Sequence, residues 1–65
     1  MNTKDVIILA RKHLGGSMES SARLCLEDAV RLEEQGNLKD AKVRALKSLA
    51  YSVGVFHKDY KRANA

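Results

Sequence analysis

Glycine placement is the feature of this sequence that most constrains its fold. The chain has no proline, and its four glycines are Gly15, Gly16, Gly36 and Gly54. Because glycine is the usual residue just beyond a helix end, the first three divide the chain into three helical segments. No stretch alternates strictly between apolar and polar residues, as a half-buried strand would. The sequence therefore predicts an all-α fold.

We expect a single domain over residues 1–65, with a short N-terminal helix followed by an antiparallel αα-hairpin. The predicted helices span residues 3–14, 18–35 and 38–61. Candidate N-cap residues for them are Asn2, Ser17 and Asn37. Gly54 lies inside the third helix and costs about 1 kcal/mol relative to alanine. The sequence fits either a kink or an early stop at that point.

A chain of 65 residues needs a source of stability beyond a small core. Its one cysteine, Cys25, excludes an internal disulfide, which leaves association with a partner as the expected route. Apolar residues of the first helix face almost every direction, and such a helix is normally buried on all sides. It can pack across the open side of the hairpin, or between the hairpin and a second copy of the chain. We favour the second arrangement, a homo-oligomeric bundle that is a dimer or larger. The predicted self-association residues are Val6, Ile7, Ile8, Leu9 and Phe56.

Charge is distributed unevenly along the chain. There are 12 basic and 8 acidic residues, for a net charge of +4, with the acidic excess on the second helix and the basic excess on the third. Six residues of the third segment recur every three or four positions and so share one helix face. They are Arg44, Lys47, Tyr51, Val55, Lys58 and Arg62. A helix face with basic side chains and an aromatic residue can bind RNA or DNA, or it can bind an acidic protein surface. It can also face the solvent without binding a partner.

Residue types with catalytic or metal-binding chemistry are sparse. Neither His13 nor His57 has a ligand partner three or four residues away, and His57 and Asp59 form only a commonplace neighbouring pair. Cys25 lies on the apolar face of its helix, as a small core residue would. The sequence therefore predicts no enzyme activity, no metal site and no cofactor.

The segment around the second glycine turn resembles the turn of a tetratricopeptide-type helical hairpin. The matching residues are Ala29, Gly36, Asn37, Leu38, Ala41 and Leu49. The sequence departs from that family at Cys25, Asp28 and Ala45, where the family prefers tryptophan, leucine and a large aromatic residue. The resemblance implies an interaction module that binds a peptide or a helix. In length and layout the chain is also similar to the small helical-hairpin dimers that regulate plasmid RNA.

These observations lead to one expected function and one alternative. We expect a cytoplasmic, non-enzymatic interaction or regulatory protein that associates with itself and binds another macromolecule. The alternative is an oligomeric RNA- or DNA-binding protein that uses the basic helix face. A membrane partner is not expected, because no apolar run approaches the roughly 20 residues that a membrane span needs.

Overall fold

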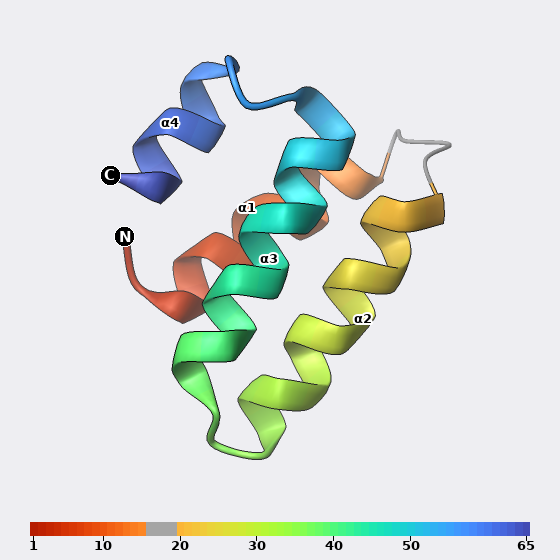
Figure 1. The fold of residues 1–65 in the computed structure, drawn as a ribbon, viewed down its shortest axis with the longest axis vertical. Coiled ribbons are helices and arrows are strands. Elements are labelled where there is room, and N and C mark those ends of the chain that lie inside the picture. Colours follow the sequence, from red (N-terminus) through yellow and green to blue (C-terminus); the bar gives the residue numbers. More distant parts are fainter. Residues whose placement is uncertain (16–19) are drawn as a thin grey trace.

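The structure is a computed structural model that describes residues 1–15 and 20–65. Over these two ranges the chain is all-helical, as predicted, and contains four helices (Figure 1). They are α1 (Thr3–Leu14), α2 (Ser20–Glu34), α3 (Leu38–Val53) and α4 (Lys58–Asn64). The prediction of three helices is therefore wrong by one, because the expected third helix is divided.

The ends of α1 follow directly from its sequence. The side chain of Asn2 accepts a hydrogen bond of 2.8 Å from the backbone N–H of Asp5, which caps the first turn. Asp5 lies in that first turn and three basic residues lie in the last, both favourable for the helix dipole. These signals give α1 the bounds that the sequence indicated. The predicted cap at Ser17 and the predicted start of the next helix at residue 18 lie outside the described residues.

The turn between α2 and α3 is a Schellman motif. Gly36 has a φ of 80°, the left-handed region that favours glycine. Its N–H donates to the carbonyl of Glu33, and the N–H of Asn37 donates to the carbonyl of Leu32, both over 2.9 Å. The Asn37 side chain makes no backbone cap and instead donates to the Asp40 carboxylate. This turn sends α2 and α3 side by side in opposite directions (Figure 1).

The predicted third helix over residues 38–61 stops early at Gly54, one of the two outcomes that the sequence left open. The φ of 90° at Gly54 lies outside the helical region, so the helical path cannot pass through this residue. The Gly54 N–H still donates to the carbonyl of Ala50, which completes the end of α3. The His57 N–H then donates to the carbonyl of Gly54, and α4 begins at the next residue.

One core joins all four helices. The hairpin seam is built from small residues, and Ser48 donates from Oγ to the carbonyl of Ala22 over 2.7 Å within it. Helix α3 packs against α1 as well as against α2. Helix α4 folds back so that its Ala63 joins the same core (Figure 1). The buried core cluster consists of Val6, Ile7, Leu9, Ala10, Leu26, Ala29, Ala45, Leu49 and Ala63.

Candidate functional site

The predicted self-association residues do not form one surface. Val6, Ile7 and Leu9 are only 0%, 4% and 8% exposed, because α1 packs across the chain's own hairpin. The structure thus corrects their assignment: α1 takes the simpler of the two arrangements considered, and its apolar residues serve this chain's core. Ile8 and Phe56 remain, at 55% and 86% exposed, on α1 and on the connection between α3 and α4.

The predicted basic stripe is also divided. Arg44, Lys47 and Tyr51 are exposed on α3, as expected for one helix face. The other three residues do not continue that face, because α3 ends at Val53. Val55 lies in the connection, while Lys58 and Arg62 belong to α4. A single helical stripe over residues 44–62 is therefore a wrong prediction, and its α3 half is the part that persists.

Two residues of that α3 half converge on a groove at the exposed side of the hairpin. This hairpin groove has a volume of about 350 Å³. It is lined by Leu32 from α2 and by Asp40, Val43, Arg44 and Lys47 from α3. Two cations and one carboxylate thus surround two apolar side chains. The hairpin groove can offer both a positive charge and an apolar contact to a ligand.

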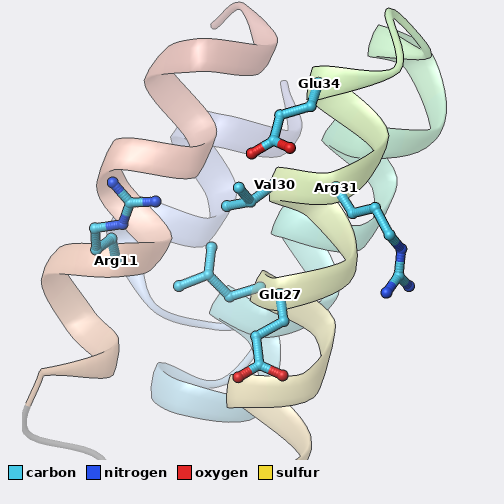
Figure 2. A pocket seen from close by; sticks show the side chains of 6 residues that line it. Arg11, Glu27, Val30, Arg31 and Glu34 are labelled. Atoms are coloured by element: carbon cyan, nitrogen blue, oxygen red, sulfur yellow. The ribbon is translucent and has the colours of Figure 1, made fainter.

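A second groove of about 360 Å³ lies between α1 and α2. Figure 2 shows Arg11 on α1 across from Val30 and Glu34 on α2, while Arg31 points away from α1. Arg31 forms its own ion pair with Asp28 on α2. Since Arg11 shares this groove with two glutamates, its lining carries no excess of positive charge.

A third group of residues escaped the sequence-based search. His13, His57 and Asp59 each offer one potential ligand atom, and these atoms all lie within 4.8 Å of one another. Nε2 of His13 lies 2.8 Å from Oδ2 of Asp59. The two imidazole rings meet edge to face, with centroids 5.2 Å apart and planes inclined by 71°. We refer to these three residues as the histidine–aspartate cluster.

Helix ends position the histidine–aspartate cluster. His13 lies in the last turn of α1, whereas His57 is the N-cap of α4 and Asp59 lies in the first turn of α4. Nδ1 of His57 accepts a hydrogen bond of 3.0 Å from the Asp59 N–H, the role that serine or asparagine usually performs at an N-cap. Arg62 lies one turn further along, with its guanidinium 3.5 Å from Oδ1 of Asp59. His57 and Asp59 are thus held by local contacts within α4 as well as by the cluster, whereas His13 is placed by α1 and the cluster alone.

The surroundings of Asp59 favour its ionised form. The hydrogen bond from His13 lowers the pKa of this carboxyl most, partial burial opposes that effect, and the positive charge of Arg62 lowers the pKa further. The Asp59 side chain is only 13% exposed and that of His13 20%. Beside them, Lys12, Lys58 and Arg62 line a polar hollow with Asp59. The cluster therefore fastens α4 to α1 around an ionised carboxylate.

Comparison of the chain with protein-family models, with curated proteins and with solved structures produced no match. Within the part of the chain that the structure describes, no helix has both the length and the apolar character needed to cross a membrane.

Proposed function

We propose that this protein is a non-enzymatic helical interaction protein that binds a partner protein through the hairpin groove. The observation that carries the proposal is the convergence of Arg44 and Lys47 on the apolar side chains of Leu32 and Val43. The resemblance of the turn to a tetratricopeptide-type hairpin agrees with an interaction role. A cytoplasmic location belongs to the same proposal, since the free thiol of Cys25 suits a reducing compartment.

The chemistry of the groove defines the partner segment. Arg44 and Lys47 favour carboxylates, and Arg44 can bind one in the two-pronged manner of a guanidinium. Leu32 and Val43 favour apolar side chains between those carboxylates. The expected ligand is therefore an acidic segment with interspersed apolar residues, such as one face of an amphipathic helix. The overall net charge of +4 would also accelerate encounter with such a segment.

Two features favour a protein over a nucleic acid at this groove. The groove includes the carboxylate of Asp40, and its opposite wall is the acidic helix α2. Both would repel any anionic partner, but less so an acidic segment with apolar residues between its carboxylates than a continuous phosphate backbone, whose affinity depends on many basic contacts. The basic residues that could have extended the contact, Lys58 and Arg62, lie on another helix.

Self-association is a second candidate, supported by Phe56. This ring is 86% exposed beside the exposed side chain of Val55 in the connection between α3 and α4. Phenylalanine is among the residue types that are enriched where protein chains meet. Light scattering coupled to size-exclusion chromatography should show a dimer or larger species, and Phe56→Ser should return it to a monomer. A monomeric wild-type protein at tens of micromolar, a range in which interfaces of modest affinity form, would remove this candidate.

A binding experiment with defined probes tests the groove. Fluorescence anisotropy should detect binding of a labelled acidic amphipathic helical peptide to the protein at low salt, where electrostatic attraction is strongest. R44E/K47E should abolish that binding. The matched control R23E/K39E also lowers the net charge from +4 to 0, and it alters exposed residues outside the groove. Equal loss in both variants would contradict the proposal, and tighter binding of an RNA or DNA oligonucleotide would favour the alternative function.

A further inference from the structure

We propose that the histidine–aspartate cluster is a binding site for a divalent transition-metal ion, with Zn²⁺ as the best-fitting ion. The site is separate from the hairpin groove and does not depend on it. Its ligands would be Nε2 of His13, Oδ2 of Asp59 and a ring nitrogen of His57. The proposal begins from the fact that three metal-ligating groups, far apart in the sequence, meet at the junction of α1 and α4.

The spacing of the ligand atoms suits an ion at their centre. Zn²⁺ binds histidine nitrogen and carboxylate oxygen at about 2.0–2.2 Å. Ligand atoms at tetrahedral angles around it therefore lie about 3.4 Å apart. The three atoms in the structure already lie within 4.8 Å of one another, so small side-chain rotations would complete the site. The 2.8 Å contact between His13 and Asp59 would lengthen slightly as the ion replaces the shared proton.

Two of the three ligands, His13 and Asp59, already face each other before any ion arrives. Because a backbone N–H can only donate, Nδ1 of His57 accepts from Asp59 and the proton of the neutral ring is on Nε2, so His57 would give up this hydrogen bond to bind the ion through Nδ1. The Arg62 guanidinium approaches Oδ1 of Asp59, which leaves Oδ2 directed at His13. Supporting contacts of this kind commonly hold metal ligands in place. The fold thus meets part of the cost of ordering the side chains, and release of the His57 cap adds to that cost.

The donor set selects the class of ion. Two imidazoles and one carboxylate suit Zn²⁺ and neighbouring first-row transition metals, whereas Mg²⁺ and Ca²⁺ prefer oxygen ligands. Three protein ligands leave a fourth position open to water. The nearby charges of Lys12, Lys58 and Arg62 oppose a cation, so removal of one lysine should strengthen binding.

The consequence for the fold is a stronger attachment of α4. Since His13 belongs to α1 while His57 and Asp59 belong to the start of α4, a shared ion would bridge the two helices. An ion that binds the folded chain and not the unfolded one raises the apparent stability. Zn²⁺ should therefore raise the melting temperature and reduce proteolysis within α4.

Variants that keep each local contact but remove the metal ligand test the site. His57→Asn retains an N-cap side chain, and His13→Gln retains a donor toward Asp59. Calorimetric titration of the untagged protein with Zn²⁺ should show one ion bound per chain. Each variant should weaken binding at least about tenfold, given the losses seen when even supporting contacts are removed. The control Lys58→Gln should bind as tightly as the wild type or tighter.

Any one of three binding results would overturn the proposal. The first is that the wild type does not bind Zn²⁺, and the second is that both histidine variants still bind it. The third is that the wild type binds Mg²⁺ as tightly as Zn²⁺. Circular dichroism without metal should confirm that the variants fold. NMR should show the His13 and His57 ring resonances shifting together as Zn²⁺ is added. A shift of only one ring would also contradict a shared ion.

Discussion

Nε2 of His13 lies 2.8 Å from Oδ2 of Asp59, although 46 positions separate the two residues in sequence. The contact joins the last turn of α1 to the first turn of α4. A helix of seven residues such as α4 is too short to be stable alone, because helix nucleation is costly. Its one fully buried residue, Ala63, supplies little apolar area. This polar contact and the packing of Tyr60 and Ala63 against the core therefore hold α4 in position together.

Stability should fall in acid partly because of Asp59. Its folded-state pKa lies below the ordinary value of 3.8, so its contribution is complete above that pH and disappears as the pH falls through the lowered value. The charged and titratable groups around it are Lys12 and His13 from α1 and His57, Lys58 and Arg62 from the α4 side. Urea unfolding in the presence of a chelator should show a smaller loss of stability below pH 3.8 for Asp59→Asn than for the wild type.

The control for this experiment is Glu34→Gln, which neutralises an exposed carboxylate on α2. This variant should follow the wild-type pH dependence. If Asp59→Asn also follows it, the contact between Asp59 and His13 contributes nothing to stability.

Gly54→Ala should destabilise the fold by about 1–2 kcal/mol, because an alanine at a φ of 90° meets steric strain. Gly15→Ala is the matched substitution at the end of α1. Gly15 has right-handed helical angles, and an added Cβ would meet the carbonyl of Lys12 at an ordinary 3.6 Å. The free energy of unfolding of Gly15→Ala should equal that of the wild type or exceed it by up to about 1 kcal/mol. Urea denaturation followed by circular dichroism measures both, and equal effects would contradict the assigned backbone break.

Ser48→Ala and Ser52→Ala should have opposite effects on the free energy of unfolding. Ser48 Oγ donates to the carbonyl of Ala22 inside the hairpin seam, so its removal should cost about 0.5–1.5 kcal/mol. Ser52 Oγ is buried and has no hydrogen-bond partner among the described residues. Its removal should therefore raise stability, by up to about 1 kcal/mol. Both changes replace serine by alanine within α3, so the gain in helix propensity largely cancels in the difference between them.

Local signals made α1 and the hairpin turn predictable. Asn2 and Gly15 mark the two ends of α1, and Gly36 has the left-handed conformation that a Schellman turn requires. The break at Gly54 was harder to predict, because one glycine costs a helix only about 1 kcal/mol. Beyond Gly54, Phe56 and Tyr60 continue the helical spacing of apolar residues. The apolar pattern therefore runs past the end of α3 without marking it.

The histidine–aspartate cluster could not be found from spacing along the sequence. A search at three or four residues detects ligands on one helix, whereas His13 and Asp59 lie on helices that meet only after α4 folds back. The assignment of Val6, Ile7 and Leu9 to a self-association surface failed for a related reason. A two-helix hairpin alone was not expected to cover the apolar side chains of Val6, Ile7 and Leu9. In the structure these side chains are buried in a core that also includes Ala63 of α4.

Affinity capture with matched variants tests the proposed partner site most directly. Wild-type protein, R44E/K47E and R23E/K39E would each be used as bait in a nuclease-treated extract, and the captured proteins compared by quantitative mass spectrometry. We predict a protein with an acidic, partly apolar segment that is retained by the wild type and by R23E/K39E but lost from R44E/K47E. Retention of the same proteins by R44E/K47E, or loss of all capture after nuclease treatment, would contradict the proposal that the hairpin groove binds a partner protein.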